Sequence, residues 1–308
     1  MKLLLSSKLA VAAVALGTSV GLARASSIVV IKSSDLGAYT EVATEVASGS
    51  RSSVAVVTLP ADKRNGGAVR QVWEAKPDVI VAVGARALAV AAEEFPNIPV
   101  VFGMVGDPSQ YIGDLGAAGV ELLPSDRQVL GALRKVLPRA KEVTIVYDPG
   151  RSSEEVKRFV DAGRVLGIRI STLEFSGAPT SFDAKGSLSG SCDCIVIYPD
   201  PVMLSDTVFG SIVYEAFAQG LPALAYSSTF AAKGALMSVE ADYASVARDL
   251  VDLAEQILAG RSPRSVGVHA PSRVKITVNG AVADELGITI PSEAGSSIEI
   301  IADESARR

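Results

Sequence analysis

The chain has 308 residues, a formal net charge of −5 and 48% hydrophobic residues. No run of basic residues interrupts this acidic composition, which argues against nucleic acid as a partner. With two cysteines, the chain has no disulfide framework, so we expect its fold to depend on a large apolar core.

The first 25 residues are typical of a secretory signal peptide. Lys2 and Lys8 give a positive start, Leu9–Leu16 is a short apolar stretch, and Ala23-Arg24-Ala25 is a small-x-small cleavage site. A membrane anchor is the less favoured alternative, because the apolar stretch is shorter than the ~20 residues of a span. We therefore expect an exported mature chain of residues 26–308, long enough for one large domain or two ordinary ones.

Seven apolar runs along the mature chain predict buried strands. They are continuous rather than alternating, which is typical of parallel strands that are covered by helices on both faces. The runs are Ile28–Ile31, Val54–Leu59, Val79–Val83, Val100–Phe102, Val143–Tyr147, Ile195–Tyr198 and Leu221–Tyr226.

Helical patterns lie between these runs and make the predicted class α/β. Ser125–Gln128 is a capping box before apolar residues at helical spacing, and Ser152–Glu155 is interpreted as a second box. Val246–Ile257 carries the apolar face of a third helix, which Gly260 ends. Trp73 falls on an apolar helical stripe and is expected in the core.

A short apolar segment, Gly119–Pro124, predicts a division into two lobes. It follows the fourth run without a full helix between them and is interpreted as a crossing strand, after which a second set of strand–helix units begins. We expect residues 26–121 and 240–262 in the first lobe, and residues 122–239 and 263–308 in the second.

The loops after the predicted strands carry polar groups. The carboxyl ends of parallel strands converge on a crevice, and two facing sheets would make a cleft lined by such loops. Asp107, Asp148 and Asp200 each precede a proline in these loops, and Asp-Pro is also ordinary turn chemistry. Three tyrosines end strands and either plug the sheet edge or stack against a ligand, namely Tyr147, Tyr198 and Tyr226.

Motifs for common catalytic chemistry are absent from the sequence. It has no phosphate-binding loop, dinucleotide fingerprint, zinc-protease helix or nucleophile elbow. His269 stands alone in a Pro-flanked segment, so no nucleophile–base pair can be assembled, and we expect neither an enzyme nor a cofactor or metal. Cys194 opens a predicted strand and is interpreted as packing there, with a redox or metal role for Cys192 and Cys194 as the weaker alternative.

Four blocks of the sequence resemble a known family. They are KPDVIVAVGARALA (76–89), IPVVFGMVGDP (98–108), GALMSVEADYASVARDLVDLAEQILAG (234–260) and KITVNGAVADELGITIP (275–291). In order and spacing they resemble the ABC-transporter substrate-binding proteins of the group that includes bacterial aromatic amino-acid binders. The resemblance covers most of the mature chain and implies a type I periplasmic-binding fold, with two Rossmann-like lobes, three crossing strands and a ligand closed between the lobes.

The binding loops match this family only in part. The hydroxyl that usually follows the Gly after the third strand is missing, because Gly84 is followed by Ala85 and Arg86. The loop after the first strand reads Ser33-Ser34-Asp35 instead of the usual residues, whereas the VGDP loop is intact. Together with the strand-end analysis, this comparison gives a set of expected ligand-binding residues. They are Ser34, Ala85, Arg86, Gly106, Asp107, Asp148, Ser152, Asp200, Tyr226 and Ser227.

Arg86 is expected to set the charge of the ligand. A guanidinium at a helix start adds positive charge where backbone N–H groups already favour an anion, which predicts carboxylate ligands. The alternative is that Arg86 pairs with Glu93 or Glu94 on its own helix. If the ligand is an amino acid, its ammonium group needs a carboxylate, and Asp200 or Asp107 is the expected partner.

The expected function is that of a periplasmic, non-catalytic receptor for an amino acid or related carboxylate. As a monomer, it would deliver this ligand to an ABC permease in the inner membrane. The alternative is an exported sensor or accessory protein of the same fold that acts on a signalling or secretion partner. An exported hydrolase is a third, weaker interpretation.

Overall fold

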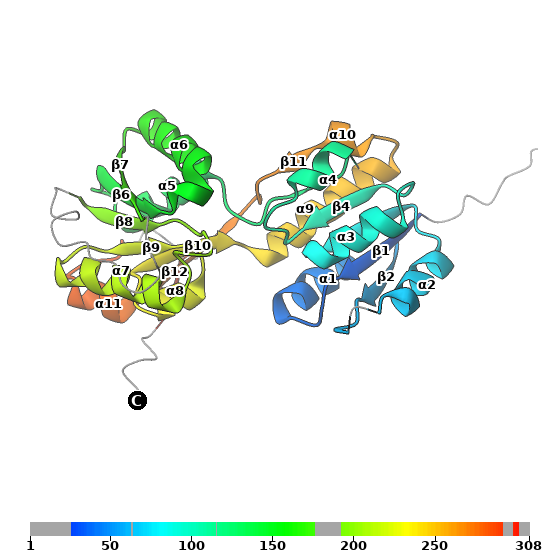
Figure 1. The fold of residues 1–308 in the computed structure, drawn as a ribbon, viewed down its shortest axis with the longest axis horizontal. Helices are drawn as coiled ribbons and strands as arrows, with labels where there is room; N and C mark the ends of the chain where they lie inside the picture. Colours follow the sequence, from blue (N-terminus) through cyan, green and yellow to red (C-terminus); the bar gives the residue numbers. More distant parts are fainter. Residues whose placement is uncertain (1–25, 63, 115, 176–191, 292–297, 302–308) are drawn as a thin grey trace, which may run out of the picture.

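The computed structural model describes residues 26–62, 64–114, 116–175, 192–291 and 298–301. These residues form two α/β lobes, each built around its own sheet, which lie side by side and are joined by extended segments (Figure 1). These two lobes of alternating strands and helices confirm the predicted α/β class. The expected signal peptide, residues 1–25, lies outside the described residues.

The first lobe has a six-stranded sheet in which the registered pairs are all parallel. Its core strands are fully buried apolar runs, as the continuous pattern predicts. In the spatial order β11-β5-β4-β3-β1-β2 the strands are β11 (Val268–His269), β5 (Ala118–Val120), β4 (Val100–Gly103), β3 (Val79–Val83), β1 (Ser27–Lys32) and β2 (Ser53–Thr58).

Helices cover both faces of this sheet. α1 (Gly37–Gly49) and α9 (Tyr243–Leu258) pack on one face, and α2 (Gly66–Ala75) and α3 (Ala85–Glu94) pack on the other. The short helices of this lobe are α4 (Ser109–Asp114) and α10 (Pro263–Val266). The expected core position of Trp73 is wrong, because its side chain is 53% exposed on α2 and only flanks Phe95.

The second lobe has a seven-stranded sheet that is parallel except where β10 pairs with β12. Cys194 opens β8 and is fully buried, as expected, while Cys192 beside it is partly exposed. The strands in spatial order are β13 (Ile298–Ile301), β12 (Val274–Asn279), β10 (Met237–Ala241), β9 (Ala223–Ala225), β8 (Cys194–Ile197), β6 (Glu142–Tyr147) and β7 (Arg169–Glu174).

Two groups of helices enclose the second sheet. One face is covered by α5 (Asp126–Val136), α6 (Pro149–Leu166) and α11 (Gly280–Glu285), and the other by α7 (Asp206–Ala218) and α8 (Ser228–Ala232).

Two predicted helix starts have different outcomes. The capping box at Ser125 is confirmed at the start of α5. The second box, at Ser152, is wrong. α6 begins one turn earlier, because the Asp148 side chain caps it and Pro149 occupies its first turn.

The chain crosses between the lobes at residues 121–125, 241–242 and 270–273. Residues 263–269 belong with the first lobe, where we expected the second, because β11 pairs with β5 and α10 packs on α9. Among the described residues, no helix is both long enough and apolar enough to span a bilayer.

Candidate functional site

A cavity of about 490 Å³ lies between the two lobes. The first lobe contributes the loop after β4, and the second contributes the ends of β8 and β9 together with one side of α6. The crossing segment after β5 forms its floor. The lining residues are Val105–Ser109, Ile112, Glu121–Asp126, Glu155, Arg158, Tyr198, Tyr226 and Val268.

A smaller cavity of about 220 Å³ shares part of this wall. Leu122, Leu123, Pro124 and Tyr226 line both cavities. The rest of the smaller cavity comes from the second lobe and from the crossing between β10 and α9. These residues are Pro199, Leu204, Ser227, Phe230, Glu240, Ala241 and Tyr243.

Tyr198 and Tyr226 form an aromatic pair in the wall of the larger cavity. Their ring centroids are 6.0 Å apart in an edge-to-face arrangement. Tyr226 is only 8% exposed, and its hydroxyl group has no hydrogen-bond partner in the part of the chain that the structure describes. Burial raises the pKa of both phenols well above the usual value, so both are neutral at physiological pH.

The charged groups around the larger cavity are mainly acidic. Four carboxylates line it, from Asp107, Glu121, Asp126 and Glu155, against the single guanidinium of Arg158. Arg158 is paired with Glu155 at 3.2 Å. The cavity wall is therefore net negative, so an anionic solute would meet repulsion there.

Asp126 is the carboxylate that burial perturbs in this wall. It is the first residue of α5, and no hydrogen bond or ion pair joins its side chain to the described residues. Desolvation raises its pKa above the ordinary value of 3.8, although Arg158 opposes this shift. Asp107, by contrast, is exposed, and hydrogen bonds from the side chain and the backbone N–H of Ser109, the latter at 3.0 Å, lower its pKa.

Four of the expected ligand-binding residues line a cavity. Gly106, Asp107 and Tyr226 line the larger one, and Ser227 lines the smaller one together with Tyr226. Tyr198 also reaches the larger cavity, whereas Tyr147 lines neither and donates its hydroxyl hydrogen to Glu174.

Asp200 does not have the position that we expected. It is 4% exposed, and its carboxylate accepts backbone N–H groups of Asp148 at 3.0 Å, Val202 at 3.0 Å and Met203 at 2.9 Å. A carboxylate that accepts three such bonds is a loop anchor, so its expected role as the partner of an ammonium group is wrong.

Asp148 and Ser152 also have local structural roles. The Asp148 carboxylate caps α6 by accepting the Gly150 N–H at 2.9 Å, and it lies 3.5 Å from the Arg151 side chain. Ser152 is buried inside α6, with a non-helical φ of −128°. Neither residue lines the cavity between the lobes.

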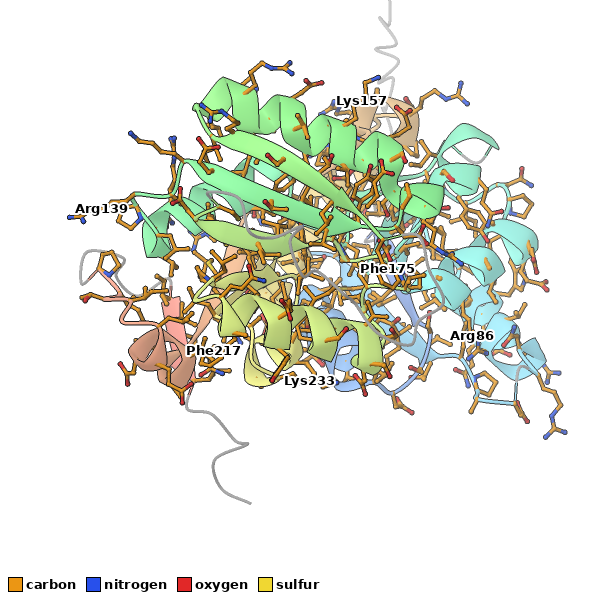
Figure 2. The ribbon with its side chains drawn as sticks, turned by 60° about the vertical axis from the view of Figure 1, so that its left-hand side comes forward. Arg86, Arg139, Lys157, Phe175, Phe217 and Lys233 are labelled. Atoms are coloured by element: carbon orange, nitrogen blue, oxygen red, sulfur yellow. The ribbon has the colours of Figure 1, made fainter. Side chains whose placement is uncertain are left out.

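Arg86 joins two loops of the first lobe instead of facing a ligand. Its guanidinium donates to the carbonyl oxygens of Ser33 at 3.1 Å and Pro60 at 2.8 Å, which follow β1 and β2. Figure 2 shows Arg86 among the blue and cyan elements of the first lobe. It therefore has neither the cleft role nor the Glu93 or Glu94 pairing that we considered. Ser34, in the loop after β1, and Ala85, the first residue of α3, line neither cavity.

Sequence reasoning missed Asp126, Glu155 and Arg158. Asp126 was interpreted only as part of a capping box, yet the crossing strand directly before it places that helix start at the cleft. Glu155 and Arg158 lie one helical turn apart on α6, where the sequence indicates only a capping role for Glu155 and nothing for Arg158. Among the described residues, no three or more His, Cys, Asp or Glu side chains gather as metal ligands would.

Comparison with known proteins gives the family. The profile described as "ABC transporter substrate binding protein" matches residues 62–298. The fold is similar to the ligand-free, open structure of a substrate binding protein with adhesive properties from Clostridium difficile (TM-score 0.70, 19% identity, covering 91% of this chain and 100% of that chain).

Two other solved structures share the fold. The ABC domain in complex with L-Trp from Streptococcus pneumoniae has a TM-score of 0.55 at 18% identity, covering 89% of this chain and 100% of that chain. A conserved domain protein from Vibrio cholerae has a TM-score of 0.55 at 19% identity, covering 91% of this chain and 100% of that chain. A search of curated protein sequences gave no match. With two lobes of the type I periplasmic-binding fold and a family profile matched over most of its length, the chain belongs to the ABC transporter substrate-binding protein family and is a solute-binding protein.

Proposed function

We propose that the protein is an exported, non-catalytic receptor that binds an amino acid between its lobes and delivers it to the permease of an ABC importer. The observation that carries this proposal is the cavity of about 490 Å³ to which both lobes contribute. A solute that contacts both walls stabilises the closed arrangement of the lobes over the open one. A permease can then distinguish the loaded, closed receptor from the empty, open one.

The lining supports an amino acid rather than a sugar or a simple acid. The pair Tyr198 and Tyr226 offers aromatic surface for a side chain, and the acidic wall suits an ammonium group. Arg158 is the cationic group in the wall that could meet a carboxylate. The L-Trp complex of the pneumococcal structure is consistent with this ligand class.

The location and the partner follow from the same proposal. The N-terminal residues read as an export signal, and a receptor of this family works outside the inner membrane, where the permease collects its solute. One chain supplies both walls of the cavity, so a monomer is sufficient for binding.

A thermal-shift screen of residues 26–308 with amino acids, small carboxylates and sugars tests the proposal. A ligand at 100 times its dissociation constant should add about 2.7 kcal/mol to the free energy of unfolding. We expect amino acids with an aromatic or large apolar side chain to raise the melting temperature. Stabilisation by sugars or by acids alone, or by none of the compounds, would contradict it.

A further inference from the structure

We infer that Asp126, Tyr198 and Tyr226 form a subsite for an ammonium group, so that a solute is selected for its positively charged amine. This inference rests on the proposed function and adds the chemical group that is recognised and the residues that recognise it. All three side chains line the larger cavity, and all three come from the second lobe.

The carboxylate of Asp126 is available to a ligand. The neighbouring carboxylates of Asp200 and Asp148 are occupied by backbone N–H groups, and that of Glu155 is paired with Arg158. Asp126 forms no such bond with the described residues, although it is half-buried in the cavity wall. Partial burial of a carboxylate that accepts no hydrogen bond from the described residues is costly, and an ammonium group from a solute would supply such a bond.

The two tyrosines complete the subsite with different groups. Both tyrosines line the larger cavity with their ring centroids 6.0 Å apart, and a cation is attracted by the negative face of such a ring. Tyr226 adds a hydroxyl oxygen without a partner on a side chain that is more than nine-tenths buried. An ammonium group has three N–H donors, which is enough for both the carboxylate and this oxygen.

The net charge of the wall favours the same choice. Glu121 and Asp107 add two further negative charges on the side of the first lobe, and Arg158, in an exposed pair with Glu155, is the one cationic group among the described residues of the wall. Desolvation holds the Asp126 carboxylate at a raised pKa, and a cation beside it would reverse this shift. A carboxylate entering without an ammonium group would instead add repulsion to a wall that is already acidic.

Calorimetric titration at pH 7 with three matched probes tests the inference. L-Phenylalanine, phenethylamine and 3-phenylpropionate share a phenyl group and differ in whether they carry both charges, the ammonium alone or the carboxylate alone. We expect the first two to bind and the third to bind at least tenfold more weakly. The Asp126→Asn variant should lose about tenfold or more in affinity for the two amines, the usual effect of one charge-assisted bond.

Two further variants control for indirect effects. Asp126→Glu keeps the charge and should retain part of the affinity, whereas Asp252→Asn, an exposed carboxylate on the outer side of α9, should bind both amines like the wild type. Equal binding of the amines by Asp126→Asn, or preference for 3-phenylpropionate, overturns the subsite while leaving a solute receptor in place. Binding of no probe, with sugars stabilising the chain instead, contradicts both the subsite and the proposed amino-acid receptor.

Discussion

The buried carboxylate of Asp200 accepts the backbone N–H of Asp148 at 3.0 Å, which ties the loop after β8 to the loop after β6. Both residues precede a proline, and both loops lie at the cleft edge of the second sheet. Hydrogen bonds from backbone N–H groups to the Asp200 carboxylate therefore hold these strand-end loops of the second lobe in place in the absence of a solute.

Asp200→Asn should destabilise the free protein by about 2–4 kcal/mol, because an amide has one acceptor oxygen and its NH₂ group would face a backbone N–H donor. Urea unfolding of residues 26–308 measures this loss. Asp206→Asn, at an exposed position on α7, is the matched control and should change stability much less. If Asp200→Asn had unchanged stability but bound amines more weakly, Asp200 would be a ligand-binding residue instead of a loop anchor.

Arg86→Ala should lower stability by about 1–3 kcal/mol, because the loops after β1 and β2 lose two charge-assisted bonds to their carbonyl oxygens. Arg86→Lys should rescue little of this loss, since an ammonium group cannot reproduce the fork of a guanidinium. The control is Arg70→Ala, on the exposed side of α2. A selective loss of carboxylate binding in Arg86→Ala, with its melting temperature unchanged, would support a cleft role instead.

Tyr226→Phe separates the hydroxyl group from the ring. The hydroxyl is buried without a partner, so its removal should leave the unliganded protein as stable as the wild type or about 1 kcal/mol more stable. The same change should weaken phenethylamine binding, because the amine loses an acceptor. Chemical denaturation gives the first quantity and calorimetry the second. A clear loss of stability without ligand would show that the hydroxyl has a partner in solution.

The pH dependence of Asp126 has a definite sign. Its folded-state pKa is raised above 3.8, so the stability linked to this group is present at low pH and is lost as the pH rises through the raised pKa. Asp126→Asn should therefore gain melting temperature relative to the wild type between pH 4 and pH 7. Phenethylamine affinity should show the opposite trend and fall as the pH drops and Asp126 is protonated. If the wild-type melting temperature, relative to Asp126→Asn, and the phenethylamine affinity changed with pH in the same direction, Asp126 would not be the titrating partner of the amine.

The fold could be predicted from the sequence because continuous apolar runs and caps are local signals. Val79–Val83 is apolar at every position, which predicts a strand buried on both faces, and the structure has it so. Ser125 and Gln128 form the capping box that starts α5. The lobe boundary was misplaced because β11 has two residues, which is too short for any periodic pattern.

The candidate site could be predicted only in part. Four residues that the strand-end rule indicated, Gly106, Asp107, Tyr226 and Ser227, line a cavity. This rule could not tell a carboxylate that faces a ligand from one that anchors a turn, because Asp200 and Asp107 have the same Asp-Pro context. That difference depends on which backbone N–H groups the fold brings near each carboxylate. Asp126 was missed for the converse reason, since its helix-cap context concealed its position at the cleft.

The central claim is that a solute binds between the lobes and draws them together. Small-angle X-ray scattering of residues 26–308, with and without a saturating amine-bearing ligand from the screen, measures this most directly. We predict a smaller radius of gyration in the complex and, at a ligand concentration close to the wild-type dissociation constant, a much smaller decrease for Asp126→Asn than for the wild type. Binding at one solute per chain with an unchanged radius of gyration would contradict the account.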